Sequence, residues 1–320
     1  MKNHLTRREF LATSAAVGAG LATSGLLAQE SFKTRLRKAV IVGRPTEANL
    51  KPIKEAGFDG VEVTDWKLAA KDAAACRETA QKVGVPIHCV LFGWAQFNKD
   101  KDAAAKSIAE VEASIAAAQA YGADALLLVP CRIGEMPMPE AWEFQIEFDE
   151  KTGHLKRVAA GDNDKYKAYM EAHDQAVDSS IEAVKKLIPA AQKAKVVIAL
   201  ENVWNNLWVK PAFFQSFVAS FQSEWVKAYL DLGNCVKYSP TEDWVKALGS
   251  LLVRCHVKDF KLNENGHGGK FVDIRDGSVN WPVVRKALDD AAYSGWMTIE
   301  GGKLSLAEHS KRLDLIIAGK

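Results

Sequence analysis

Cysteine is scarce in this 320-residue chain and follows no recognisable pattern. The five cysteines are odd in number, widely spaced and without a CxxC pair, which argues against a disulfide framework and a thiolate metal site. Cys89, Cys235 and Cys255 lie in or just after apolar strand-like runs, where a small buried thiol is the ordinary arrangement. We therefore expect reduced, buried cysteines.

An excess of charge of one sign is lacking as well. The whole chain carries 42 basic and 40 acidic side chains, a formal net charge of +2. Removal of the leader described next would take away Lys2, Arg7, Arg8 and Glu9 and leave equal numbers of both signs. Binding to nucleic acids or to anionic membranes draws on clustered positive charge, so neither partner is expected.

Long uncharged runs are absent except near the N-terminus. There, Arg7 and Arg8 precede a charge-free run of small and apolar residues, 11–28. This order is typical of a twin-arginine export signal and predicts a leader over residues 1–28, a mature domain over residues 29–320 and a periplasmic or otherwise exported protein. A membrane anchor or a chance arginine pair is the alternative, although the run is weakly hydrophobic for a spanning helix. No stable membrane partner is expected after cleavage.

Eight short apolar runs alternate with longer helical patterns after the leader. The expected strands cover residues 39–43, 58–63, 85–92, 124–129, 196–203, 226–232, 252–259 and 296–300. Between them, apolar residues recur at three- and four-residue spacing, as in 108–118 and 166–184. Near-continuous apolar strands separated by helices predict a parallel sheet covered by helices, and eight repeats predict a single (β/α)8 barrel, the TIM-barrel fold.

Connections between these elements carry two further signals. Gly57, Gly84 and Gly122 each follow a helical run and precede a strand, where a left-handed helix cap is needed. The stretch from Cys131 to Asp164, after the fourth strand, is too long for a simple connection. We expect it to fold over the barrel mouth as a lid or substrate loop.

The last four expected strands end in side chains that can bind a metal ion: Glu201, Asp231, His256 and Glu300. Because the active site of such a barrel forms at the carboxyl ends of its strands, three carboxylates and one imidazole should meet there. One such residue alone would as readily cap a helix. Four together predict a divalent cation, since three buried carboxylates without one would repel each other. The ligand set suits Mn²⁺, Mg²⁺, Co²⁺ or Zn²⁺.

Several motifs resemble those of the xylose-isomerase-like sugar phosphate isomerase/epimerase superfamily, over about residues 38–318. They are, in chain order, 56–62 (AGFDGVE), Glu201, 231–234 (DLGN), 256–259 (HVKD), 277–281 (GSVNW) and 295–300 (GWMTIE). The resemblance implies a barrel with its metal on the four residues named above. It also implies that Glu201 and Glu300 exchange a substrate proton.

The chemistry of these residues supports the same interpretation. A cation polarises a carbonyl and stabilises an enediolate, while a carboxylate removes the adjacent C–H proton. Lys258 can add positive charge to the developing oxyanion; a solvated lysine at the barrel rim is the alternative.

Substrate contacts are predicted at five positions: Glu62, His88, Arg132, Trp204 and Asn234. Glu62 and His88 close the second and third strands, although His88 fits a satisfied histidine inside the barrel equally well. Arg132 follows the fourth strand and can contact an acidic or polyhydroxy substrate or form a loop salt bridge. Trp204 can stack on a sugar ring or pack in the core.

The chain also departs from the ketose 3-epimerases of the superfamily. These usually have a histidine, a glutamate and an arginine where this chain has Asn234, Leu207 and Leu262. The departures weigh against a 3-epimerase and leave the metal site intact. Endonuclease IV, the nucleic-acid branch, needs more histidines than these strand ends supply.

The leading interpretation is a metal-dependent isomerase or epimerase acting on a free sugar or small keto-sugar. Export and the lack of a glycine-rich phosphate cradle favour an unphosphorylated substrate. A metal-dependent lyase or hydratase on a keto-sugar or keto-glycoside would share every residue up to the fate of the enediolate. A non-catalytic sugar-binding barrel, the third alternative, would keep the tryptophans and lose carboxylates. The expected partner is a small carbohydrate, and a homo-oligomer is compatible with the sequence.

Overall fold

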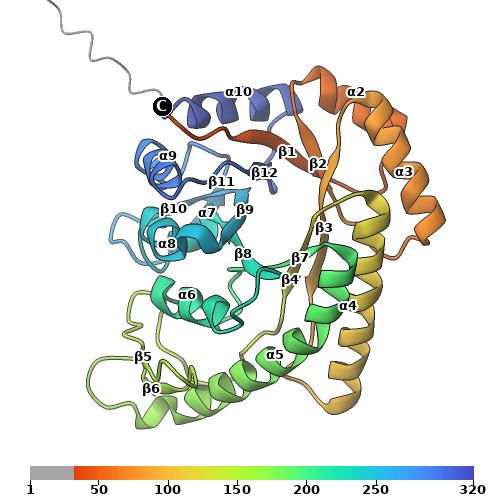
Figure 1. Cartoon of the computed structure of the whole chain (residues 1–320). Helices are drawn as coiled ribbons and strands as arrows, with labels where there is room; N and C mark the ends of the chain where they lie inside the picture. Colours follow the sequence, from red (N-terminus) through yellow and green to blue (C-terminus); the bar gives the residue numbers. More distant parts are fainter. Residues whose placement is uncertain (1–31) are drawn as a thin grey trace, which may run out of the picture. The chain divides into compact units, whose positions relative to one another are not determined.

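Eight parallel strands close into a barrel in the computed structural model, which describes residues 32–320 (Figure 1). In ring order the strands are β1 (Arg37–Val42), β12 (Trp296–Ile299), β9 (Leu252–Val257), β8 (Val226–Asp231), β7 (Val197–Glu201), β4 (Ala125–Val129), β3 (Ile87–Trp94) and β2 (Gly60–Val63). β1 closes the ring by pairing in parallel with both β12 and β2. The predicted (β/α)8 barrel is therefore confirmed.

The helices lie outside the strands and follow them in turn (Figure 1). They are α2 (Glu47–Glu55), α3 (Ala70–Val83), α4 (Lys101–Tyr121), α5 (Lys167–Ala194), α6 (Pro211–Ala219), α8 (Thr241–Leu248), α9 (Trp281–Asp290) and α10 (Leu306–Ile317), with the short α7 (Leu232–Cys235) and two 3-10 turns, η1 (Asp164–Tyr166) and η2 (Gly249–Leu251). Because helices cover the strands from outside and side chains fill the barrel inside, a strand such as β4 is buried along its whole length.

Left-handed glycines end the helices where the sequence predicts them. Gly84 and Gly122 cap α3 and α4 with φ of 79° and 76°, and Gly57 follows α2 with φ of 85°. The amide of Gly122 bonds to the carbonyls of Ala118 and Gln119, which would otherwise lack partners at the helix end.

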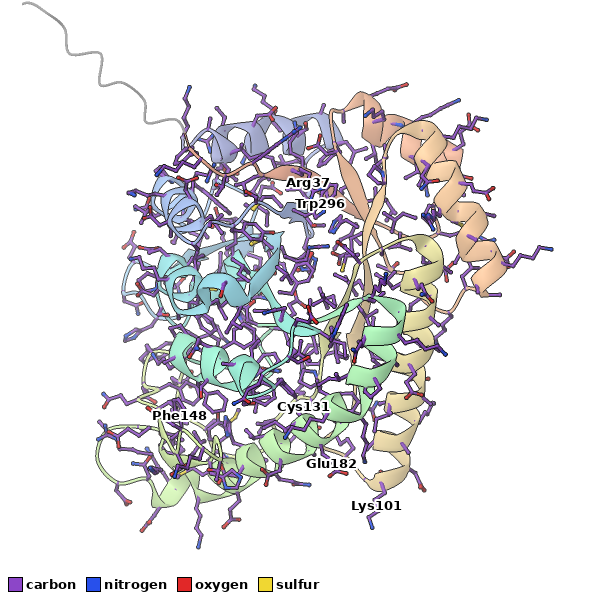
Figure 2. All side chains as sticks on the ribbon, viewed as in Figure 1. Arg37, Lys101, Cys131, Phe148, Glu182 and Trp296 are labelled. Carbon is purple, nitrogen blue, oxygen red and sulfur yellow. The ribbon has the colours of Figure 1, made fainter. Side chains whose placement is uncertain are left out.

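The amino-terminal end of the barrel is filled by stacked side chains. The guanidinium of Arg37 lies 4.0 Å from the ring centroid of Trp296, and the His88 ring stacks on Trp296 at 4.4 Å (Figure 2). Gly60 makes room for this stack, because a Cβ atom there would come within 2.5 Å of the indole. This stack fills the barrel at the end opposite to the functional site.

Two excursions leave the barrel at the carboxyl ends of strands. The predicted loop after β4 contains the antiparallel pair β5 (Glu147–Phe148) and β6 (Leu155–Arg157), and Trp142 within it stacks on His267 at 4.2 Å. His267 lies in a second hairpin, β10 (Asp259–Leu262) and β11 (Gly269–Val272).

The sequence did not predict the second hairpin. It placed residues 252–259 in one strand, whereas β9 ends at Val257 and Asp259 begins the hairpin. The Asp259 carboxylate accepts hydrogen bonds from the returning chain. The first excursion contacts segments that follow later strands, which agrees with its predicted place at the mouth; its role as a lid stays a prediction.

All five cysteines are buried and free, as expected. Among residues 32–320, none of the helices is both long and apolar enough to cross a membrane. The predicted leader, residues 1–28, lies outside the described residues.

Candidate functional site

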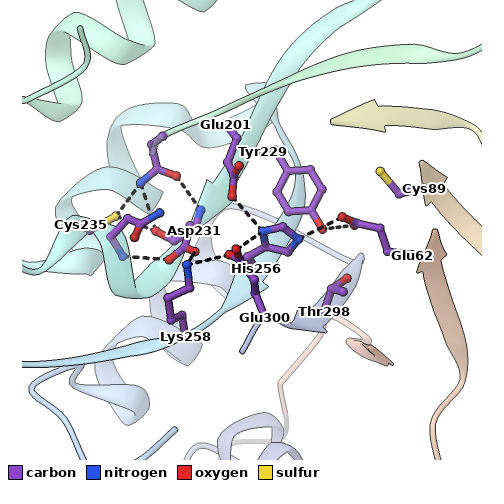
Figure 3. A network of polar contacts seen from close by, with 12 residues as sticks. Glu62, Cys89, Glu201, Tyr229, Asp231, Cys235, His256, Lys258, Thr298 and Glu300 are labelled. Carbon is purple, nitrogen blue, oxygen red and sulfur yellow. Dashed lines mark hydrogen bonds and ion pairs between the residues drawn. The ribbon is translucent and has the colours of Figure 1, made fainter. Parts of the chain in front are cut away.

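Four neighbouring strands each present one metal-competent side chain at their carboxyl ends (Figure 3). Glu201 and Asp231 end β7 and β8, His256 is the last residue but one of β9, and Glu300 directly follows β12. One ligand atom from each of the four lies within 4.8 Å of all the others. The barrel therefore brings the four predicted residues to one point.

His256 lies at the centre of this group. Its Nδ1 atom is 2.8 Å from Oε1 of Glu201 and 3.1 Å from Oε2 of Glu300. Burial by itself lowers the pKa of His256, but Glu62, Glu300 and Glu201 raise it well above its usual value. The group thus attracts positive charge, in the form of a ring proton or of a cation.

Lys258 is the second cationic side chain of the group. Its Nζ atom is 3.2 Å from Oδ2 of Asp231 and 2.8 Å from Oε2 of Glu300. Burial by itself lowers the pKa of Lys258, but these two carboxylates raise it above its usual value, so the ammonium form is retained. Lys258 is therefore a paired, largely buried ammonium and not a solvated lysine at the rim.

The three carboxylates differ in basicity. Burial raises the pKa of Glu201, and it raises the pKa of Asp231 to about 7. Burial also acts to raise the pKa of Glu300, but His256 and Lys258 lower it well below its usual value. Glu201 is consequently the more basic of the two glutamates, and two carboxyl groups with unequal pKa values suit separate acid and base roles.

Two carboxylate oxygens at the centre of the site have ion-pair contacts but make no hydrogen bond. Oδ2 of Asp231 and Oε2 of Glu300 are buried in this way; the Lys258 ammonium is an ion-pair partner of both, and His256 is a second partner of the Glu300 oxygen. Three carboxylates in one buried group call for more positive charge than one ammonium and one imidazolium supply. Three oxygen donors and one imidazole nitrogen fit a divalent ion, so the donor set is chemically suited to the predicted metal.

Two buried residues lie behind His256, on the Nε2 side of its ring. Oε1 of Glu62 is 3.1 Å from His256 Nε2, and the Tyr229 hydroxyl donates to Oε2 of Glu62 at 2.6 Å. Glu62, predicted to bind substrate, is therefore fully buried with protein partners on both oxygens. Sequence reasoning missed Tyr229, because an aromatic residue within an apolar strand is indistinguishable from core; the need of a buried hydroxyl for a partner was the available signal.

Asn202 is a second residue that the sequence did not single out. Its Nδ2 donates to the carbonyl of Asp231 at 3.0 Å, and its Oδ1 accepts from the Asp231 amide at 2.5 Å. β7 ends at Glu201, one residue before Asn202. The Asn202 side chain thus makes the two hydrogen bonds to the Asp231 backbone that a neighbouring strand would otherwise make. Asn234, predicted to bind substrate, donates its backbone N–H to Oδ1 of Asp231 at 2.8 Å and is itself buried.

The remaining predicted substrate residues are divided between barrel interior and mouth. His88 lies inside the barrel, where its Nε2 is 3.1 Å from the Thr298 hydroxyl and burial lowers its pKa well below the usual value. This placement matches the alternative of a satisfied interior histidine. Trp208, in the segment after β7, is 1% exposed and packs against Phe214.

Arg132 and Trp204 lie at the mouth and line a common cavity of about 400 Å³ together with Asn206. The guanidinium of Arg132 lies over the ring of Trp94, which is 45% exposed. Trp204 donates its Nε1–H to the carbonyl of Asn234 at 3.0 Å, which places the cavity beside the metal-competent group. The Trp204 ring itself is engaged by protein neighbours, since it stacks on Phe271 at 4.7 Å.

Solved structures share this fold at low sequence identity. A xylose isomerase domain protein from Planctomyces limnophilus is 14% identical, with 88% of this chain and 94% of that chain covered and a TM-score of 0.62. A 3-keto-D-glucoside 4-epimerase from E. coli is 13% identical, with 89% and 99% covered and a TM-score of 0.64. An L-ribulose 3-epimerase is 15% identical, with 88% and 94% covered and a TM-score of 0.64. At these identities the likeness concerns the fold.

Curated proteins contain no sequence match to the chain. The family model described as a xylose isomerase-like TIM barrel, in contrast, matches residues 50–314, which include all eight longer helices in part or whole and the four metal-competent residues. The chain belongs to the xylose isomerase-like TIM barrel family.

Proposed function

We propose that this protein is a metal-dependent isomerase or epimerase that acts on a free sugar or small keto-sugar by proton abstraction next to a carbonyl. The observation that carries the proposal is the meeting of Glu201 and Glu300 at one atom, Nδ1 of His256, with Lys258 beside Glu300. The titles of structural neighbours, among them a 3-keto-D-glucoside 4-epimerase and an L-ribulose 3-epimerase, support a sugar as the substrate.

The chain's own residues have separate tasks in this proposal. Glu201, Asp231, His256 and Glu300 would hold Mn²⁺, Mg²⁺, Co²⁺ or Zn²⁺, and the ion, when bound, would polarise the carbonyl and stabilise negative charge on its oxygen. Glu201 and Glu300 come from β7 and β12, which two other strands separate, so they approach a substrate from different directions. One carboxylate can therefore remove a proton and the other return it, while the Lys258 ammonium stabilises the developing oxyanion.

Solvent exchange tests the proposal directly. A panel of free ketoses and 3-keto-glucosides is incubated with the protein and saturating Mn²⁺ in D₂O, and mass spectrometry follows deuterium at the carbon next to the carbonyl. We expect exchange with at least one compound. Glu300→Gln and Glu201→Gln should each lower its rate by about a thousandfold or more, since a general base and a ligand charge are both lost.

Glu182→Gln is the matched control, because Glu182 lies on the outer face of α5, paired with Lys186. It should exchange at the wild-type rate. Exchange at the wild-type rate in both site variants, or no exchange with any compound, would contradict the mechanism.

A lyase or hydratase acting on a keto-glycoside is the second candidate. The cavity lined by Arg132, Trp204 and Asn206 favours it, because it offers about 400 Å³ beside the site for the part of a glycoside remote from the reacting carbon. Both reactions begin with the same proton abstraction. Product masses separate them: an epimer keeps the mass of its substrate, whereas elimination releases the alcohol or second sugar.

A further inference from the structure

His256 is held from two sides, and the proposed function uses only one of them. Its Nδ1 atom faces Glu201 and Glu300, whereas its Nε2 atom faces Oε1 of Glu62 at 3.1 Å. Glu62 belongs to β2 and reaches His256 across the barrel interior, since β1 and β12 lie between β2 and β9 in the ring. Both residues are fully buried. A carboxylate therefore stands behind the histidine where neither substrate nor solvent reaches it.

The Glu62 carboxylate is itself fixed by a second buried residue. Tyr229 of β8 donates its hydroxyl proton to Oε2 of Glu62 at 2.6 Å, so each carboxylate oxygen has one protein partner. The phenol ring of Tyr229 also packs on the His256 ring, with 4.4 Å between centroids (Figure 3). One tyrosine thus restrains both the carboxylate and the imidazole.

The chemistry of this contact shows that Nε2 carries a proton. A carboxylate oxygen cannot donate, so Nε2 of His256 must carry a hydrogen for the 3.1 Å contact to be favourable. Nδ1 also faces carboxylates, at 2.8 and 3.1 Å, so without a cation it carries a proton as well. A cation bound among those carboxylates would take the place of the Nδ1 proton, whereas the Nε2 proton would stay. Histidine ligands commonly donate their other N–H to a carboxylate, which fixes the tautomer and the ring orientation.

We propose that Glu62 and Tyr229 form a positioning pair that keeps a proton on Nε2 of His256 and aims its Nδ1 atom at the carboxylates of Glu201 and Glu300, so that a cation bound there would displace the Nδ1 proton and leave the Nε2–H tautomer. The pair acts through His256 and does not touch substrate, because both oxygens of Glu62 are engaged inside the protein. This inference rests on the proposed function only for the identity of what Nδ1 binds. The Nε2 proton itself is a property of the protein alone.

Metal affinity is one test of the pair, with Zn²⁺ as the probe in calorimetric titrations of the full-length chain. Glu62→Gln should weaken Zn²⁺ binding by about 10- to 100-fold, because the amide can present an N–H to Nε2 and thereby favour the wrong tautomer. Tyr229→Phe keeps the carboxylate and loses one of its two partners, so a smaller loss is expected. If Glu62→Gln fails to fold, as judged by circular dichroism, Tyr229→Phe still carries the test.

Tyr293→Phe is the matched control. Tyr293 is also a buried tyrosine, but its hydroxyl donates to the carbonyl of Trp296, at the amino-terminal end of β12. The variant loses a buried hydrogen bond of the same kind and should bind Zn²⁺ as the wild type does. Wild-type affinity in both Glu62→Gln and Tyr229→Phe would overturn the proposal.

NMR of ¹⁵N-histidine-labelled protein reports directly whether His256 Nε2 carries a proton. A purely structural role of Glu62 would leave this signal unchanged. The His256 signals are identified by their loss in His256→Asn. We expect a proton on Nε2 with and without Zn²⁺ in the wild type and in Tyr293→Phe, and its partial loss in Glu62→Gln. A bare Nε2 in the wild type would overturn the pair. A wild type that binds no Zn²⁺ but keeps the Glu62-dependent Nε2 proton would contradict the proposed function and support the pair.

Discussion

Asp231 and His256 carry the first prediction at the scale of single residues. His256→Ala and Asp231→Ala should each lower the metal content of the purified protein by about tenfold or more, because each removes one of four donor groups that lie within 4.8 Å of one another. Elemental analysis of the purified proteins measures the effect. His154→Ala, at an exposed histidine paired with Asp178, serves as the control. Full metal content in both site variants would rule out this site.

The same two residues predict how stability depends on pH when metal has been removed with a chelator. The pKa of Asp231 rises from 3.8 to about 7 on folding because of burial, and that of His256 rises well above 6.5 because of Glu62, Glu300 and Glu201 against the opposing effect of burial. The folded state then binds more protons than the unfolded state. The favourable contribution of His256 is complete below 6.5 and is lost as the pH rises through its folded pKa. Asp231 acts in the same direction between 3.8 and about 7.

Thermal unfolding of the metal-free protein should therefore occur at a lower temperature at about pH 8.5 than at about pH 6, by roughly 2–6 °C. The lowered pKa of Glu300 has the opposite sign but acts below 4.5, outside this window. Asp231→Asn should flatten the dependence, and Mn²⁺ should weaken it because metal binding favours deprotonated ligands. A melting temperature of the metal-free wild type that rises with pH would show that Asp231 and His256 do not hold their protons as described.

At the scale of elements, Asp259 organises the chain that follows β9. Its carboxylate accepts hydrogen bonds from the amides of Arg275, Gly277 and Val279 and from the Trp281 indole, at 2.9 to 3.2 Å. One buried side chain thereby ties β10 to the segment that leads into α9, next to Lys258 of the site. The start of the β10–β11 hairpin is thereby fixed against the segment that follows it.

Asp259→Asn tests these hydrogen bonds, because it replaces one acceptor oxygen with an NH₂ group that faces backbone amides or the Trp281 indole, which are donors themselves. The unfolding free energy should fall by about 2–4 kcal/mol, the usual cost of buried groups left without partners in such a network. Denaturant unfolding followed by circular dichroism measures it. Asp290→Asn, an exposed aspartate on α9, should change it by about 0.5 kcal/mol or less. Equal stability of both variants would mean that the amides find other partners.

Elements that depend on residues close together in the sequence could be predicted from it. Elements that depend on contacts between distant residues could not. All eight barrel strands fall within the predicted runs or overlap them closely, because each run is rich in apolar residues. Gly84 and Gly122 end helices for a local steric reason. The β10–β11 hairpin was missed, because residues 252–259 resemble one continuous strand, and the partners of the Asp259 carboxylate lie 16 to 22 positions away.

At the scale of the whole molecule, we propose that the chain is exported through the twin-arginine route and works in the periplasm. Replacing Arg7 and Arg8 together with Lys should retain the precursor in the cytoplasm, because this transport reads the arginine pair. Cell fractionation with immunodetection measures it, and Arg44→Lys, beyond the leader, is the control. Mature protein outside the cytoplasm in the double variant would refute the route.

By itself, the sequence determined the barrel, its family and the convergence of Glu201, Asp231, His256 and Glu300, because strand periodicity is local and parallel strands in a barrel all end on one face. Only the tertiary structure decided what stands behind that group. Glu62 meets His256 across the barrel, 194 positions apart, and Tyr229 meets Glu62 over 167. Such contacts depend on the stagger between strands and on which side chains point inward at each level, and no local pattern in the chain encodes either.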